Sequence, residues 1–283
     1  MKKFAALFLA LSLSAALVGC GSTEKETEKQ TEKQTEAATT EAATTEEATE
    51  AATTEAATEE ATEAATTEAA TEEVVEVMTH EEFVAAELDT KVVVETYVQD
   101  KQSWWDNTVT VYAQSEDGAY FIYNMACTEE EDKLLEVGTK IKVTGYKAEW
   151  SGEVEIVDAT FEILEGEYIA EATDVTALLG KDELIEKQNQ FVSFKGMTVE
   201  ESEGGVPFLY KWDGSGQEGD DIYFNVSIDG QTYNFTIESY LTDSSTDVYK
   251  AAQGLKVGDV IDMEGFLYWY EGVNPHITSI TVK

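Results

Sequence analysis

The chain has 283 residues, and its 58 acidic residues against 18 basic ones give a formal net charge of −40 at pH 7. Every basic residue is lysine; arginine, which makes forked contacts with phosphate, does not occur. This balance disfavours a nucleic-acid partner, because such binding relies on basic side chains that neutralise phosphates.

The first residues predict export. A charged start, "MKK", precedes the apolar run 4–18, which suits a signal peptide and is too short to span a membrane. The run ends in Leu17-Val18-Gly19-Cys20, which resembles the lipobox of bacterial lipoproteins. The resemblance implies a signal peptide over 1–19, diacylglycerol on Cys20, and an extracytoplasmic protein anchored to the bacterial cell membrane through that lipid. An ordinary secretory peptide that ends near a cysteine is the alternative.

Residues 20–74 have a composition of their own. They consist almost entirely of Thr, Glu and Ala, without any aromatic residue. Such a segment buries too little apolar surface to offset chain entropy, so we expect a disordered tether. A helix is the rival interpretation, and the frequent β-branched Thr residues disfavour it.

The next segment predicts three strands after a short helix. Thr79 and Glu82 have the spacing of a capping box. Alternating or continuous apolar residues then predict strands over 91–102, 107–114 and 119–126.

A second capping box, Thr128 with Glu131, predicts a short helix that stops at Gly138. The alternation that follows predicts a hairpin of strands 139–150 and 153–163.

The same order of elements returns downstream. Residues 174–188 predict a bridging helix, and 189–201 and 220–240 predict three strands with a turn at Asp229-Gly230. A helix over 244–254, capped by Ser244 or Ser245, precedes a closing hairpin over 259–282.

Two stretches, 134–152 and 254–272, are identical in register at six positions. These are Leu135/Leu255, Val137/Val257, Gly138/Gly258, Ile141/Ile261, Gly145/Gly265 and Gly152/Gly272. Each copy shows three strands, a helix and two strands, which is the chain order of an OB-fold. The stretch 255–265 also resembles the entry to the fourth strand in bacterial extracytoplasmic OB-fold modules. The expected fold is dominated by β structure, with two tandem five-stranded OB-like Greek-key barrels at 75–166 and 167–283, each with a helix between strands three and four.

The resemblance to OB-folds implies a ligand site on strands two and three and the loops beside them. Aromatic residues gather in those loops of both copies, so they are the candidate ligand-binding residues: Trp104, Trp105, Trp150, Tyr210, Trp212, Tyr268, Trp269 and Tyr270. Flat rings suit a glycan or a peptide. The alternative is that these rings plug the ends of the barrels.

Motifs for catalysis or cofactor binding do not occur in the sequence. There are two histidines, His80 and His276, no Ser/His/Asp order and no His/Cys metal cluster. Cys127 is interpreted as a small buried hydrophobe. The acidic loop 213–221 offers Asp213, Asp220 and Asp221 to calcium, but it lacks the EF-hand order, and a solvated turn is the simpler interpretation.

The sequence therefore predicts a surface lipoprotein that acts as a non-catalytic binding or interaction module, without a cofactor or bound metal. Its expected partners are the membrane, through the lipid on Cys20, and a glycan or protein ligand. A structural or assembly protein, a nucleic-acid-binding OB protein and an unrecognised hydrolase remain as alternatives.

Overall fold

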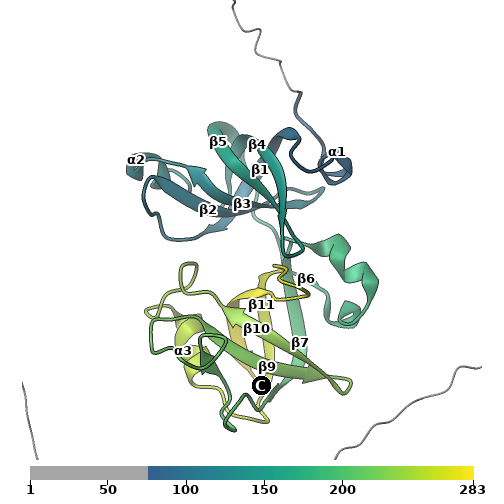
Figure 1. Ribbon diagram of the computed structural model, residues 1–283, viewed down its shortest axis with the longest axis vertical. Coiled ribbons are helices and arrows are strands. Elements are labelled where there is room, and N and C mark those ends of the chain that lie inside the picture. Colours follow the sequence, from purple (N-terminus) through teal and green to yellow (C-terminus); the bar gives the residue numbers. More distant parts are fainter. Residues whose placement is uncertain (1–75) are drawn as a thin grey trace, which may run out of the picture. The chain divides into compact units, whose positions relative to one another are not determined.

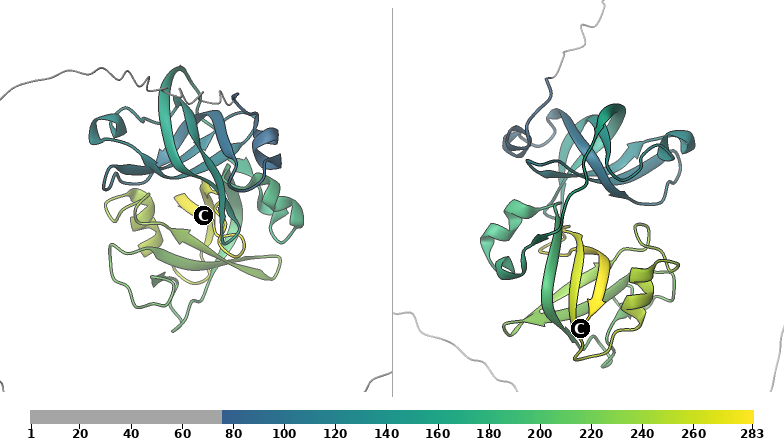
Figure 2. Two further views of the ribbon diagram at one scale, coloured as in Figure 1. Left: turned by 45° about the horizontal axis from the view of Figure 1, so that its top comes forward. Right: turned by 180° about the vertical axis from the view of Figure 1, so that it is seen from behind.

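The computed structural model describes residues 76–283, which belong to one compact unit. The predicted signal peptide, Cys20 and the tether lie outside the described residues. Figures 1 and 2 show two β-barrels that follow one another along the chain. No helix within 76–283 has the length and hydropathy needed to cross a bilayer.

The first barrel is closed, with strand order β1-β2-β3-β5-β4 and further pairing of β1 with β4. The short pairing of β3 with β5 is parallel, and the others are antiparallel. Its elements are α1 (His80–Ala85), β1 (Lys91–Lys101), β2 (Thr108–Gln114), β3 (Ala119–Ala126), α2 (Glu129–Asp132), β4 (Thr139–Trp150) and β5 (Glu153–Glu167). Both predicted capping boxes are present, at Thr79 and Thr128.

The second barrel repeats this topology. Its elements are β7 (Phe191–Glu200), β9 (Ile222–Ile228), β10 (Gln231–Ile237), α3 (Asp247–Gln253), β11 (Val260–Phe266) and β12 (His276–Val282). The order β7-β11-β12-β10-β9 closes through pairing of β7 with β9, and β10 pairs with β12 in parallel. Both barrels therefore have the strand order of an OB-fold with a helix between the third and fourth strands, which confirms the predicted fold class.

Each barrel has its own apolar core. In the first, side chains of β1 to β5 pack with Phe83 of α1 and with Cys127, which is buried as predicted. In the second, side chains of β7 and β9 to β12 pack with Tyr249 of α3.

The repeated "L-x-V-G" has one structural role in both copies. Leu135 and Leu255 are buried in their respective cores. Three residues later, Gly138 and Gly258 have φ of +91° and +90°, values that favour glycine. Their amides donate to the carbonyls of strand-one residues Val98 and Val199, at 2.7 and 2.8 Å. The repeat therefore directs the chain from each helix into the fourth strand.

The second repeated glycine allows two strands to approach closely. A Cβ on Gly145 would lie 2.6 Å from Ile156 Cγ2, and one on Gly265 would lie 2.2 Å from the His276 carbonyl oxygen. The closing hairpin shifts register at both positions. Only glycine fits there without movement of the partner strand.

Three local predictions were wrong or incomplete. The cap of α3 is Thr246 and not Ser244 or Ser245, since Thr246 Oγ1 accepts from the Tyr249 amide at 3.3 Å. The predicted bridging helix is two short 3-10 helices, η1 (Thr176–Leu178) and η2 (Asp182–Lys187), separated at Gly180, whose φ is +76°. Two-residue strands β6 (Thr173–Asp174) and β8 (Leu209–Tyr210) extend the second sheet at its ends and were not predicted.

Candidate functional site

The two barrels meet through an aromatic cluster. Tyr112 of β2, Phe121 of β3 and Phe266 of β11 are buried against one another, with ring centroids of Tyr112 and Phe266 4.6 Å apart. These rings point out of the individual barrels, so they would be exposed if either barrel stood alone. One member of this cluster, Phe121, also lines the candidate site.

Polar contacts join the barrels beside this cluster. Glu153, at the start of β5, is fully buried, and its Oε2 accepts from the Trp269 amide at 2.8 Å and from Gln188 Nε2 at 3.2 Å. Burial raises the pKa of Glu153 to about 8. Gln114 Oε1 accepts from the Phe191 amide at 2.7 Å. These bonds hold the ends of β2 and of the closing hairpin of the first barrel against the start of β7 and the segments that flank β7 and β11 in the second.

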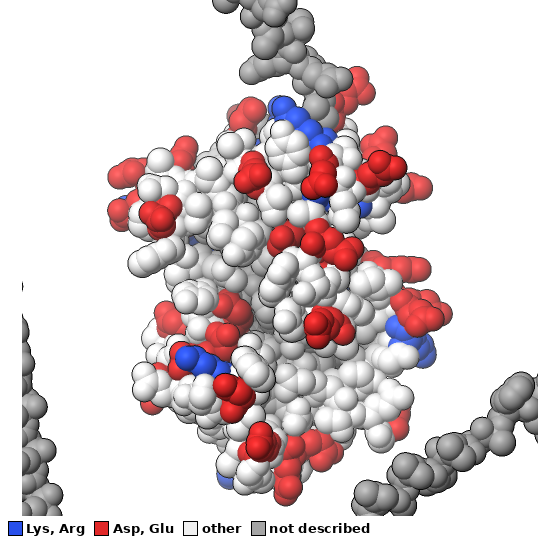
Figure 3. All heavy atoms as spheres, viewed as in Figure 1, with Lys and Arg blue, Asp and Glu red and all other residues white. Residues whose placement is uncertain are grey.

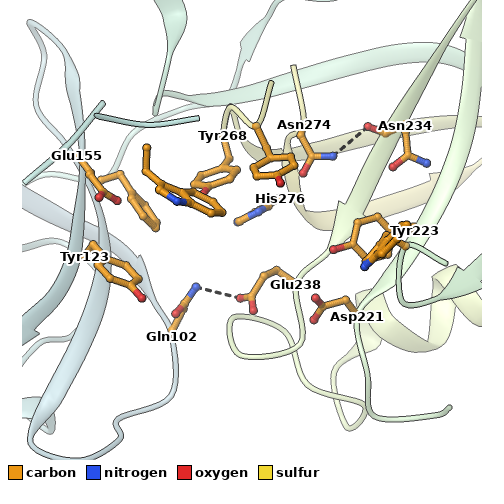
Figure 4. Close-up of a pocket in the computed structure, with 14 residues that line it drawn as sticks. Gln102, Tyr123, Glu155, Asp221, Tyr223, Asn234, Glu238, Tyr268, Asn274 and His276 are labelled. Carbon is orange, nitrogen blue, oxygen red and sulfur yellow. Dashed lines mark hydrogen bonds between the residues drawn. The ribbon is translucent and has the colours of Figure 1, made fainter. Parts of the chain in front are cut away.

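A hollow of about 950 Å³ lies between the barrels, which is within the range of sites for small molecules. The first barrel contributes the aromatic side chains Phe121, Tyr123 and Trp150. The second contributes Trp212, Tyr223, Tyr268 and Tyr270. Polar side chains stand between the rings, and Figure 4 shows them converging on the same space.

One polar wall of the hollow is a network shared by both barrels. Gln102 Nε2 donates to Glu238 Oε2 at 3.1 Å (Figure 4). The Tyr112 hydroxyl lies 2.6 Å from His276 Nδ1. The His276 ring also stacks on Tyr268, with centroids 4.2 Å apart. Burial lowers the pKa of His276 to about 3, so the ring is neutral at pH 7.

The rest of the polar lining continues from Glu238 with further amides and a carboxylate. Asn274 Nδ2 donates to the Asn234 carbonyl at 3.4 Å. Asp221 Oδ1 accepts from the amide and hydroxyl of Ser239, at 2.9 and 2.6 Å. Burial, with a contribution from Asp221, raises the pKa of Glu238 to about 7. Figure 3 shows the same excess of acidic over lysine side chains on the visible face of the molecule.

The structure brings four of the eight predicted ligand-binding residues together. Trp150, Trp212, Tyr268 and Tyr270 all line the hollow, and the rings of Trp150 and Tyr270 lie 5.1 Å apart. Trp105 is 78% exposed and lies away from it.

The other three aromatic residues are packed in the barrels. Trp104 lies against the first core and donates from Nε1 to the Cys127 carbonyl at 2.8 Å. Tyr210 and Trp269 pack on the second core, and the Tyr210 hydroxyl accepts from Gln253 Nε2. These rings have the plugging role that was the alternative interpretation.

The acidic loop 213–221 does not gather its carboxylates. Asp213 accepts from Ser215, Asp220 from the Gln217 amide, and Asp221 from Ser239, so each turns to a different neighbour. Within the described part of the chain, no group of three potential ligands lies close enough to hold a metal ion.

Sequence reasoning missed the polar half of the hollow. Gln102, Glu155, Asn234 and Glu238 lie on strands or strand ends, where a polar residue is ordinarily solvated, so no local pattern distinguishes them. His276 was noted only as a histidine outside any motif. Its position beside Pro275, at the start of β12, carried no signal of burial.

Comparison with protein families and with curated protein sequences finds no match. Among solved structures, the chain is similar to a murine DNA binding protein bound to double-stranded DNA, at 10% identity over 67% of this chain and 97% of that one, with a TM-score of 0.33. It is also similar to the p204 HINb domain, at 12% identity over 67% and 95%, with a TM-score of 0.30. A replication protein A heterotrimer bound to single-stranded DNA matches at 11% identity over 68% of this chain and 49% of that one, with a TM-score of 0.29. Likenesses at this level bear on neither ligand nor partner.

Proposed function

We propose that the chain is a lipid-anchored, extracytoplasmic binding protein whose two barrels hold a glycan in the hollow between them. The observation that carries the proposal is the convergence of aromatic rings from both barrels on one hollow that also presents amide and carboxylate side chains. Sugar rings offer apolar faces for stacking and hydroxyl groups for amides and carboxylates, so both halves of the lining have a use. The role is non-catalytic, as the sequence predicts.

The proposal is tested on a glycan array and a peptide array with the full chain and three tryptophan variants. Trp150 and Trp212 are 54% and 76% exposed, so Trp150→Ala and Trp212→Ala should fold normally. We expect each to weaken glycan binding at least about tenfold, because a stacked ring is lost. Trp105→Ala is the matched control, about as exposed as Trp212 but outside the hollow, and should bind as the parent does.

Binding confined to the peptide array would replace the glycan with a protein partner. The charge of the chain disfavours a nucleic-acid ligand, and this is checked by adding single- and double-stranded oligonucleotides to the same experiment. Glycan binding that all three tryptophan variants retain would place the ligand elsewhere on the molecule.

The anchor is a separate part of the proposal and rests on the sequence "LVGC" after an apolar run. Expression in a bacterium with a fatty-acid analogue should label the parent chain and leave Cys20→Ser unlabelled. Label retained on that variant would mean that Cys20 is not the acceptor.

A further inference from the structure

The hollow is lined by three carboxylates and by no lysine. Glu155 comes from β5. Asp221 directly precedes β9, and Glu238 directly follows β10. The lysines that form ion pairs within residues 76–283 do so with other acidic residues. The negative charge of the lining is therefore not balanced by neighbouring side chains.

Glu155 is the most informative of the three. Its side chain belongs to a residue only 9% exposed, yet its carboxylate has no hydrogen bond and no ion pair among the described residues. The residue as a whole is nine-tenths buried, so its unpaired carboxylate is partly withdrawn from solvent, and a bonded partner would offset that cost. Burial raises the pKa of Glu155. The Glu155 side chain lines the hollow, which offers space for a partner.

Asp221 and Glu238 make a second unbalanced feature across the hollow. They are close enough for the charge of Asp221 to raise the pKa of Glu238, which burial has already raised. Both face the ring of Tyr223, whose own pKa burial and these two carboxylates raise to about 12. An opposite charge nearby favours the ionised form of a carboxylate, so a cation bound beside this pair would offset the repulsion between them.

The chemistry of that cation follows from the rest of the lining. The carboxylates do not converge into a group that would hold a metal ion among the described residues. Aromatic faces stand beside them, and an ammonium group interacts favourably both with carboxylates and with the faces of Trp and Tyr. A compact organic ammonium therefore matches the hollow better than a metal ion or a neutral group.

We propose that the hollow selects glycans that carry free, protonated amino groups, with Glu155 and the pair Asp221 and Glu238 as their acceptors. This inference rests on the proposed glycan-binding function and adds the charge of the ligand to it. A neutral sugar would satisfy the amides and the aromatic rings and leave Glu155 without a partner. An amino sugar would provide partners for the amides, for the aromatic rings and for Glu155.

The test uses the full chain and three β-1,4-linked trisaccharides that share one ring geometry, those of glucose, N-acetylglucosamine and glucosamine. Binding is titrated by tryptophan fluorescence at pH 7, so that Glu238 is partly ionised, and in about 0.15 M salt, which screens exposed charges. We expect the glucosamine trisaccharide to bind at least about tenfold more tightly than the other two, because it alone brings ammonium groups.

Two variants test whether Glu155 causes the preference for the glucosamine trisaccharide. Glu155→Gln keeps the shape of the side chain. It should weaken binding of the glucosamine trisaccharide about tenfold and leave binding of the neutral trisaccharides unchanged. Glu149→Gln is the matched control, since it removes one charge from the same hairpin at an exposed position outside the hollow. It should leave all three affinities unchanged.

Three outcomes overturn the inference, and they are distinguishable. Equal affinities for the three trisaccharides would overturn the preference for amines and leave the glycan proposal standing. Glucosamine binding that Glu155→Gln does not weaken would overturn the role of the hollow in that preference. Failure of all three to bind, with no signal on the glycan array, would overturn both proposals.

Discussion

Glu153 is a buried ionisable residue at the contact between the barrels. Its pKa is raised to about 8 by burial, whereas a glutamate in the unfolded chain titrates near 4.5. The folded state therefore binds more protons than the unfolded state between these values, and stability falls as pH rises from about 4.5 through 8. One of its oxygens, Oε1, is buried without a partner, which adds to the cost of the ionised form.

Glu153→Gln should reduce this loss of stability. Between pH 5 and pH 9 we expect the free energy of unfolding of the parent to fall by roughly 2 to 4 kcal/mol on account of this group, and the variant to lose less. Urea unfolding at the two pH values measures the difference. A variant with the pH dependence of the parent would show that Glu153 is ionised at little cost.

Trp269 and Trp105 differ in burial, so their removal should affect stability differently. Trp269 lies against the second core, and a Cβ on Gly152 of the other barrel would meet its Cδ1 at 2.9 Å. Trp269→Ala should therefore cost about 2 to 4 kcal/mol, because it leaves a cavity. Trp105→Ala should change stability by less than about 0.5 kcal/mol, since that ring is exposed. Thermal melting compares them, and equal melting temperatures would contradict the assignment of Trp269 to the core.

At the scale of single elements, α1 depends on one lysine of β4. Lys147 is buried, and its Nζ donates to the carbonyls of Phe83, Val84 and Ala86 at 3.1, 2.8 and 2.8 Å. A helix of six residues has little stability of its own, and its last carbonyls need partners. The ammonium supplies them and carries a favourable charge at the helix C-terminus.

Lys147→Met should release α1 from the first barrel. The methionine keeps the apolar stem but not the donors, so we expect a loss of about 1 to 3 kcal/mol and faster amide hydrogen exchange over 80–86. Lys142→Met, on the same strand, removes only an ion pair with Glu162 at 3.6 Å and is the control. Unchanged exchange in Lys147→Met would mean that packing of Phe83 alone holds the helix.

At the scale of the whole described region, the barrels have separate cores and a shared aromatic cluster. The segment after β5 belongs with the first barrel, because the Ala170 amide donates to Gln99 Oε1 at 2.8 Å and the Tyr168 amide donates to the Gly138 carbonyl. The predicted boundary between 166 and 167 would break these bonds. A cut after 171 would spare them.

We expect fragments 75–171 and 172–283 each to melt cooperatively, since each keeps a closed barrel and its core. Each should melt several degrees below the joined chain, because Tyr112, Phe121 and Phe266 become exposed. Differential scanning calorimetry of the fragments and the full chain measures this. Fragments that do not fold would show that the barrels form a single cooperative domain.

The sequence by itself determined the order of strands and helices along the chain in both copies, and the resemblance of that order to an OB-fold implied the barrels. Alternation marked the strands, capping boxes marked two helix starts, and the repeated Leu and Gly positions matched the two fourth strands, because these signals depend on neighbours along the chain. It did not reveal β6 or β8, which are two residues long and exist only through pairing with β7 and β9.

Only the tertiary structure decided which aromatic residues share a site. From the sequence, Trp150 and Trp269 look alike, each beside a turn at the end of a strand, yet one lines the hollow and the other packs on a core. Their roles depend on how one barrel meets the other, through contacts such as Tyr112 with His276, which are 164 positions apart. The same holds for Glu155, whose lack of a partner becomes visible only when the opposite barrel encloses it.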